Sequence, residues 1–344
     1  MAATFDEVLG RTPSGNRLAR ERTERLISQI VKDVEKESFA LRLSTVHQMS
    51  TYQERYRVSN SVPEAYWING TTTAGDAPHG SSNDDDTNQV AKDSGLKQTT
   101  NMTWDNLFIN PDEIAVMVPM PDSWRVDSDI AWAEVEEAVR TAFAKTIDAA
   151  LFYGASLTTH PLPSSFGDGL VAEAIAAGNS YEEGTDAVDL ADSYAAFLQS
   201  FEQRGFKSSG VVVDNAEQWR LIRLRSAGPE KLPIYTPPTA EGPGLIYGRR
   251  LEQVDNGVFD PSLATAIVAD WGKVHVGIRQ GITFEMSKTA VIHDASGAVT
   301  YNAWQQDGQV LRAVMRLGYV VLDPYMHQTQ QREYPVQVMT PPSS

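Results

Sequence analysis

The 344-residue chain is predicted to adopt an α+β fold. Two segments, 129–153 and 187–204, place apolar residues three and four positions apart, which is the period of a helix with one buried face. A third segment, residues 309–323, alternates apolar and polar side chains with the period of two that is typical of a strand. The chain is long enough to bury a sizeable core and to hold one to three domains.

Composition and charge exclude several classes of function. Lys and Arg total 29 against 45 Asp and Glu, a formal net charge of -16, which repels phosphate and argues against specific nucleic-acid recognition. No apolar run approaches the roughly 18 residues that a membrane span needs, and the N-terminus does not have the pattern of a secretory signal. The chain has no cysteine, which excludes disulfides and thiolate metal sites and fits assembly in a reducing cytoplasm.

The first predicted helix is expected to lie outside the core. Residues 14–38 form a charged amphipathic helix that is too polar for a core position. We interpret it as an arm that packs on neighbouring molecules, and a plain surface helix is the alternative. Residues 52–69 then have an extended pattern that includes Tyr66 and Trp67.

A long polar loop interrupts this extended region. Residues 70–95 contain one Val and no larger apolar side chain, so they cannot bury enough surface to offset their own ordering entropy. A loop of this length is unusual inside a compact domain and indicates a projecting element. Residues 97–104, which end at Trp104, suggest a return strand, so we predict a long hairpin over 52–104 with a polar tip.

The strongest predicted helix runs from Asp129 to Tyr153 and would span nearly 40 Å at about 1.5 Å per residue. Asp127 and Asp129 place negative charge at its start, and Gly154 can end it in a left-handed conformation. Its apolar stripe comprises Trp132, Val135, Val139, Phe143, Ile147 and Leu151.

Shorter elements are predicted for the middle of the chain. The helix at 187–204 is followed by a buried strand at 210–214 and by a helix that Asn215 caps. Residues 226–244 hold five prolines and three glycines and are expected to form a loop. The helix at 187–204 has a stripe of Leu190, Tyr194, Phe197 and Phe201.

The C-terminal region is predicted to be rich in strands. Short strands are expected around Leu245 and at 264–268, 273–278 and 282–286, with turns at Asp270–Gly272 and Gln280–Gly281. The long strand after them places Leu311, Ala313, Met315, Leu317, Tyr319 and Val321 on one face.

Arg312 and Arg316 lie on the opposite face of that strand. Their spacing suits ion pairing across a contact between subunits, and a solvated sheet face is an equal alternative.

No constellation of catalytic residues is found. The six histidines are scattered, and the chain has neither a nucleophile elbow nor a phosphate-binding loop with its lysine. Asp84–Asp86 is better explained as a solvated charge run than as a calcium site. We therefore expect no catalytic residue, no cofactor and no metal.

Five segments carry a resemblance to a known family. In chain order they are NPDEIAVMVPMPDSW, TIDAALFYG, LIYGRRLEQVDNG, VHVGIRQGITFEMS and DGQVLRAVMRLGYVVLDP. The ordered set resembles the Hong Kong 97-type major capsid proteins of tailed bacteriophages. The resemblance implies an N-terminal arm (1–51), an extended loop (52–103), a peripheral domain with a spine helix (104–154), an axial domain (155–278), and a peripheral return with a C-terminal tail (279–344).

A function follows from this resemblance. It implies a structural subunit that assembles into pentamers and hexamers and encloses double-stranded DNA in a virion capsid built in the host bacterial cytoplasm. Candidate contacts between subunits are Tyr66, Trp67, Trp104, Arg312 and Arg316. About fifty residues precede the extended loop, fewer than in family members with a fused scaffolding region. Either the chain is a matured form or, as we expect, a separate scaffolding protein assists assembly. The resemblance also implies a portal as a further partner and DNA contact through non-specific proximity alone, and a decoration protein is left open.

Two alternatives compete with this interpretation. An encapsulin-type nanocompartment shell resembles the same fold but encloses cargo protein. A cytosolic hydrolase would need a carboxylate of raised pKa in a concave site, and the sequence offers no candidate.

Overall fold

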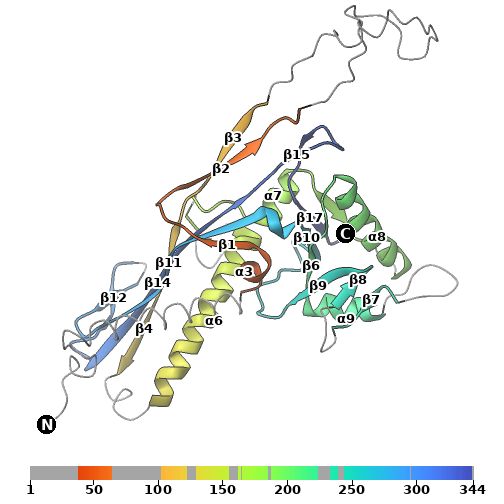
Figure 1. Ribbon diagram of the computed structural model, residues 1–344. Helices are drawn as coiled ribbons and strands as arrows, with labels where there is room; N and C mark the ends of the chain where they lie inside the picture. The colour runs from red at the N-terminus through yellow and green to blue at the C-terminus, as the bar shows by residue number, and fades with distance from the viewer. Residues whose placement is uncertain are drawn as a thin grey trace, which may run out of the picture.

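The longest described helix, α6 (Asp129–Tyr153), runs from the middle of the subunit to its lower edge in the view of Figure 1. The computed structural model describes residues 38–63, 102–121, 129–154, 162–163, 165–184, 187–223, 233–238, 244–294 and 296–342. The helix has the bounds predicted from its apolar stripe, and Gly154 ends it with a φ of +54°. Asp127 and the side chain of Trp132 lie outside the described residues. The buried stripe comprises Val139, Phe143, Ile147 and Leu151, as predicted.

A four-stranded sheet in the order β1-β11-β14-β4 lies beside α6. β1 (Thr45–Gln48) runs parallel to β11 (Val274–Ser287), while β14 (Gly308–Val321) is antiparallel to both β11 and β4 (Asp112–Pro121). The six apolar residues predicted for one face of β14 are all buried, as expected. On the opposite face Arg312 and Arg316 are exposed, but Val310 and Val314 are buried too, so burial does not alternate strictly along the strand.

The turn predicted at Gln280–Gly281 is wrong. These residues lie inside β11, whose pairing with β14 continues past them with register shifts around Gln280. A bulge absorbs extra residues without ending the ladder, and β14 is long enough to satisfy the backbone groups of β11 on both sides. The turn predicted at Asp270–Gly272 is confirmed, since a short 3-10 helix, η2 (Trp271–Lys273), lies immediately before β11.

A second sheet has seven strands in the order β5-β17-β10-β6-β9-β8-β7. Helix α8 (Ala187–Gln203) packs its predicted stripe of Leu190, Tyr194, Phe197 and Phe201 into the core of this part. The strands are β5 (Ser180–Glu182), β17 (Val336–Thr340), β10 (Ala266–Ala269), β6 (Gly210–Asp214), β9 (Arg249–Val254), β8 (Gly244–Ile246) and β7 (Tyr235–Thr236).

Two local predictions in this sheet need correction. Helix α9 (Asn215–Arg223) begins at Asn215 itself, so the residue before the helix is Asp214, whose Oδ2 accepts from Ala216 N at 3.3 Å. The proline-rich segment expected to be a loop contains β7, because Tyr235 and Thr236 find backbone partners in β8. The sequence also carried no prediction for β9.

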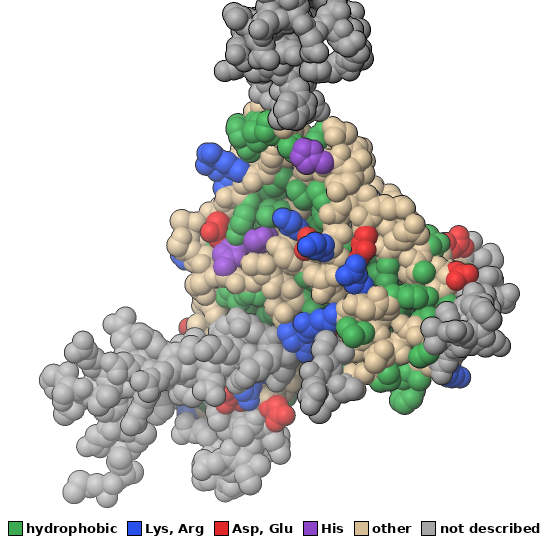
Figure 2. Space-filling model, turned by 45° about the vertical axis from the view of Figure 1, so that its right-hand side comes forward, with side chains coloured by type: hydrophobic (Ala, Val, Ile, Leu, Met, Phe, Trp, Pro, Cys, Tyr) green, Lys and Arg blue, Asp and Glu red, His purple; other side chains and the backbone are tan. Residues whose placement is uncertain are grey.

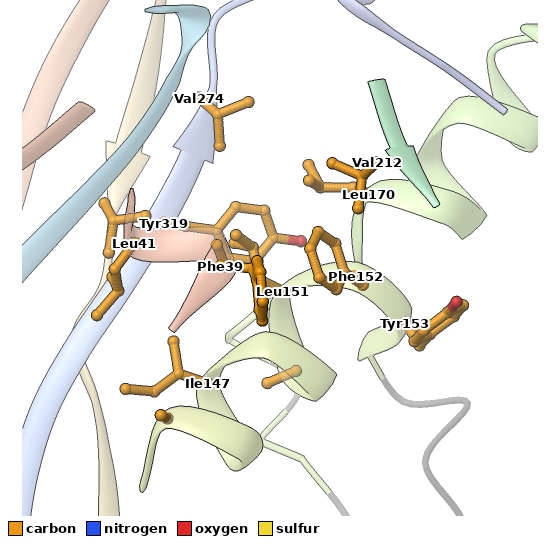
Figure 3. Packing of buried hydrophobic residues seen from close by; sticks show 14 of the residues in the cluster. Phe39, Leu41, Ile147, Leu151, Phe152, Tyr153, Leu170, Val212, Val274 and Tyr319 are labelled. Atoms are coloured by element: carbon orange, nitrogen blue, oxygen red, sulfur yellow. The ribbon is translucent and has the colours of Figure 1, made fainter. Parts of the chain in front are cut away.

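The two sheets share one apolar core (Figure 3). Phe39 and Leu41 of α3 (Phe39–Leu43) lie beside Ile147 and Leu151 of α6 and Tyr319 of β14. Helix α7 (Leu170–Ala176) contributes to the same cluster, as does β6 of the seven-stranded sheet. The subunit body therefore packs as one unit.

Asp148 of α6 lies in this core with 0% of its surface exposed. Its carboxylate accepts from Ser38 Oγ at 2.6 Å, Phe39 N at 3.1 Å, Ala40 N at 2.9 Å and Asn256 Nδ2 at 2.6 Å. Burial raises the pKa of Asp148, and these hydrogen bonds oppose the shift. The carboxylate thus attaches the start of α3 to the middle of the subunit.

A two-stranded hairpin projects from the body (Figure 1). β2 (Glu54–Ser59) pairs antiparallel with β3 (Trp104–Ile109), so Ser59 lies opposite Trp104. The base of the predicted hairpin is confirmed, but the return strand begins at Trp104 rather than ending there. Residues 14–37 of the predicted arm helix and residues 64–101 of the loop lie outside the described residues.

Two small hairpins, β12–β13 and β15–β16, complete the described elements. They are β12 (Val291–His293), β13 (Val299–Asn302), β15 (Tyr325–Met326) and β16 (Gln331–Arg332). The sheets draw on distant parts of the chain, since β1 joins the four-stranded sheet and β17 the seven-stranded one. The five domain ranges stay a prediction.

Candidate subunit interface

The inner face of the β2–β3 hairpin, formed by Glu54, Tyr56 and Val58 with their partners on β3, contacts the body. His47 of β1 lies between two of these residues: its Nε2 is 2.8 Å from Glu54 Oε2 and 3.0 Å from Tyr56 Oη. His275 of β11 lies next to them, with its ring 5.1 Å from that of Tyr56. The fold therefore brings together two histidines that are far apart in the sequence.

Burial favours the neutral form of two side chains in this cluster, His275 and Tyr56. Burial lowers the pKa of His275, and the positive charges of His47 and Lys273 lower it further. Burial raises the pKa of Tyr56, and Glu54 adds to the shift. At neutral pH, His275 is therefore uncharged and Tyr56 keeps its proton, so the cluster holds the hairpin by hydrogen bonds and ring contacts.

Arg332 of β16 holds the hairpin from a second side. Its NH1 donates to Asp105 Oδ2 at 2.6 Å and to Asn60 Oδ1 at 3.1 Å, while its NH2 pairs with Asp323. Arg332 and Asp105 are 227 positions apart, so no local pattern in the sequence could have indicated this contact. The direction in which the hairpin leaves the body is fixed by these two attachments.

Of the predicted contact residues, Trp104 lies on the opposite, outer side of the hairpin. Its side chain is 57% exposed at the start of β3, and Phe108 on the same side is 45% exposed. Exposed aromatic side chains are typical anchors of protein interfaces. Tyr66 and Trp67 lie outside the described residues.

Arg312 and Arg316 already have partners within the subunit. Arg312 NH2 lies 2.8 Å from Glu285 Oε2 of β11, and Arg316 Nε and NH2 lie 3.0 and 2.6 Å from Glu113 Oε2 of β4. These are cross-strand pairs of one sheet, and the arginine side chains remain 48% and 46% exposed. Such exposed pairs contribute about 0–1 kcal/mol, so both arginines remain available to other contacts.

The described residues contain no group of three or more His, Asp or Glu side chains that could hold a metal ion. Burial raises the pKa of two of the described acids, Asp148 and Glu217. Asp148 accepts the hydrogen bonds described above, and Glu217 is bound to Tyr194 and Arg220. None of the described helices is long and apolar enough to cross a membrane. Figure 2 shows acidic and basic side chains interspersed over one face of the molecule.

Comparisons with known proteins agree with this geometry. The sequence model of the Phage capsid family matches residues 23–325, whereas no curated protein matches the chain. A structure from Mycobacterium phage Adephagia is 22% identical, with a TM-score of 0.70 over 89% of this chain and 91% of its own.

Two further solved structures cover a similar share of the chain. One from Microbacterium phage Oxtober96 is 28% identical, with a TM-score of 0.67 over 88% of this chain and 91% of its own. The capsid of an empty GTA particle is 12% identical, with a TM-score of 0.57 over 89% of this chain and 90% of its own. The Hong Kong 97-type fold expected from the sequence is confirmed, and the chain belongs to the Phage capsid family.

Proposed function

We propose that this protein is the structural subunit of an icosahedral phage capsid, which assembles into pentamers and hexamers around double-stranded DNA. The observation that carries the proposal is the family match over residues 23–325. A subunit of this kind needs a rigid body and extended contact surfaces rather than a pocket. Two sheets that share one core, with a hairpin attached at two points, meet that need.

Contacts between subunits are assigned to the projecting hairpin and to the outer face of β14. We propose Tyr66, Trp67 and Trp104 as aromatic anchors and Arg312 and Arg316 as polar contacts. The ranges 1–51, 52–103, 104–154, 155–278 and 279–344 are proposed as arm, extended loop, peripheral domain, axial domain and peripheral return with tail.

Other partners follow from this role. Assembly takes place in the host bacterial cytoplasm with a separate scaffolding protein, and a portal occupies part of the finished shell. The net charge of -16 favours a capsid shell that contacts packaged DNA without binding it specifically. The protein acts as a structural subunit of this shell and not as an enzyme.

The encapsulin alternative is not favoured, because the family model and the compared structures come from phages and a GTA particle. A hydrolase is not favoured either, since the described carboxylates whose pKa is raised by burial, Asp148 and Glu217, are both held by hydrogen bonds within the fold.

The test is to express the full chain with its scaffolding protein and to examine the product by electron microscopy and light scattering. We expect a closed shell in the megadalton range. A stable monomer or dimer under all assembly conditions would overturn the proposal. Particles isolated from the cells that produce them and found to contain cargo protein instead of DNA would favour the encapsulin-type alternative.

A further inference from the structure

An Asn–Gly pair, Asn256 and Gly257, lies in the loop after β9 and contacts the buried carboxylate of Asp148. The two residues belong to neither a helix nor a strand. Asn256 is half-buried, whereas Gly257 is exposed. The structural role proposed for the subunit assigns no function to this pair.

Gly257 has the properties of an attacking nitrogen. Its φ of +70° lies in the left-handed region that favours glycine, and a Cβ placed on it would meet no atom within 4 Å, so its surroundings are open. Its N–H has no hydrogen-bond partner among the described residues. A peptide nitrogen of this kind is well placed to close a five-membered ring on the side chain of a preceding asparagine.

The amide group of Asn256 is held at both ends. Its Oδ1 accepts from Val258 N at 3.2 Å, and its Nδ2 donates to Asp148 Oδ2 at 2.6 Å. Ring closure places negative charge on Oδ1, where the N–H of Val258 already donates. It also requires that Nδ2 take up a proton, and the carboxyl group of Asp148 lies against this nitrogen. Burial raises the pKa of Asp148, which increases the fraction of the protonated form that donates.

We propose that Asn256 is a self-modification site, at which the backbone nitrogen of Gly257 displaces the side-chain nitrogen of Asn256 as ammonia. The nitrogen of Gly257 loses its proton and forms a bond to Cγ of Asn256. The bond between Cγ and Nδ2 breaks, and Nδ2 takes up a proton and leaves as ammonia. Water then opens the ring and leaves an acid at position 256. One asparagine and one water thus give one acidic residue and one ammonia, with no oxidation or reduction.

The product would weaken the attachment of α3. The new carboxylate would lie beside that of Asp148, and two carboxylates at hydrogen-bond distance do not both stay ionised. Asp148 would lose the donor at position 256, while it still has to hold Ser38 Oγ and the backbone N–H groups of Phe39 and Ala40. Since water does not restore the amide, modified subunits would accumulate with time.

The first experiment follows the peptide that contains Asn256 by mass spectrometry while the folded, unassembled full chain is kept at neutral pH. A synthetic peptide with the sequence of residues 252–260 gives the rate without the fold. We expect the folded chain to lose the amide at least as fast as the peptide and to release ammonia. A slower loss in the folded chain would overturn the proposal, because the contacts of Asn256 would then protect the amide.

A substitution of the attacking residue provides the second test. We expect Gly257→Ala to slow the modification of the folded chain about tenfold or more, because its Cβ stands beside the attacking nitrogen and disfavours the positive φ. The matched control is Gly248→Ala, at a glycine that also has a positive φ and open surroundings but does not follow an asparagine. Equal rates in Gly257→Ala and in wild type would contradict the attack by this nitrogen.

The consequence for α3 is tested by Asn256→Asp, which introduces the charge of the product. We expect faster hydrogen exchange of residues 38–43 than in wild type, as measured by mass spectrometry. Asn106→Asp makes the same charge change at an exposed position of β3 and should leave this exchange unchanged. Unchanged exchange in Asn256→Asp would refute the loss of attachment. All three experiments use the unassembled chain, so their outcome is independent of the capsid function.

Discussion

At the scale of single residues, buried polar groups connect parts of the chain that are distant in sequence. Asp148 joins α6 to the start of α3 and to Asn256, and Glu173 of α7 joins β14 to Tyr334, which precedes β17 (Val336–Thr340). Glu173 accepts from Tyr319 of β14 at 2.9 Å and from Tyr334 at 2.6 Å. Each carboxylate satisfies donors that would otherwise be buried without a partner.

We expect Asp148→Ala to lower the free energy of unfolding of the unassembled subunit by about 3 kcal/mol or more. The substitution leaves the donors of Ser38, Phe39, Ala40 and Asn256 without their acceptor, and each buried unsatisfied group is costly. Urea unfolding followed by circular dichroism measures the change. Glu137→Ala, at an exposed position of the same helix, is the control, and equal stability of the two variants would refute the role given to Asp148.

The tyrosines that contact Glu173 predict a loss of stability at alkaline pH. Burial raises the pKa of Tyr319 and Tyr334 well above the ordinary value, and the charge of Glu173 raises both further. Above about pH 10 the unfolded chain releases protons that the folded chain retains, so the free energy of unfolding falls as pH rises.

We expect the double variant Tyr319→Phe with Tyr334→Phe to have a shallower fall, since each tyrosine contributes up to about 1.4 kcal/mol per pH unit. Urea unfolding at several values between about pH 9.5 and 11.5 measures the slope. Tyr52→Phe, at a highly exposed position, should leave the slope unchanged. An unchanged slope in the double variant would show that these tyrosines titrate normally.

At the scale of elements, α6 shows how far one buried stripe determines a helix. Its four innermost stripe residues face a core shared by both sheets, so the helix is stabilised mainly by packing and less by intrinsic propensity. A charge introduced into the stripe should therefore disturb the whole subunit.

We expect Val139→Asp to cost several kcal/mol and to yield insoluble subunits or none, because Val139 is 3% exposed and the new carboxylate would have no partner. Ala138→Asp places the same side chain at the neighbouring exposed position and should remain soluble. Solubility and shell formation are measured for both variants. Native-like shells from Val139→Asp would show that this face of the helix is not buried.

At the scale of the whole molecule, we expect stability and assembly to depend on different parts of the chain. The apolar cores of the described residues are built from α3, α6, α7, α8 and the two large sheets, and the tip of the extended loop lies outside the described residues. Because the sequence of residues 70–95 has one Val and no larger apolar side chain, the loop is expected to act between subunits.

We expect deletion of residues 74–91 to leave the subunit folded, as measured by circular dichroism, and to impair shell formation or shell stability, as measured by light scattering. Replacement of the same residues by a Gly-Ser segment of equal length separates the effect of loop length from that of its side chains. Unfolding of the isolated subunit by the deletion would show that the loop belongs to the folding unit.

The elements that the sequence by itself determined are those whose pattern is local. α6, α8, β6 and β14 were predicted from the spacing of their apolar residues. This spacing indicates which residues are buried, whichever element packs against them. The Hong Kong 97-type fold also followed from the sequence, through the order of its segments.

The tertiary structure alone decided which distant residues meet. The sequence did not indicate that Arg332 holds Asp105, that Arg312 and Arg316 pair with acids on adjacent strands, or that β11 continues through Gln280–Gly281. Contacts between distant residues depend on where complete strands and helices are placed. The sequence around a residue therefore does not indicate which distant residue it contacts. For the same reason the outer face of the hairpin became visible only when the register of β2 and β3 was known.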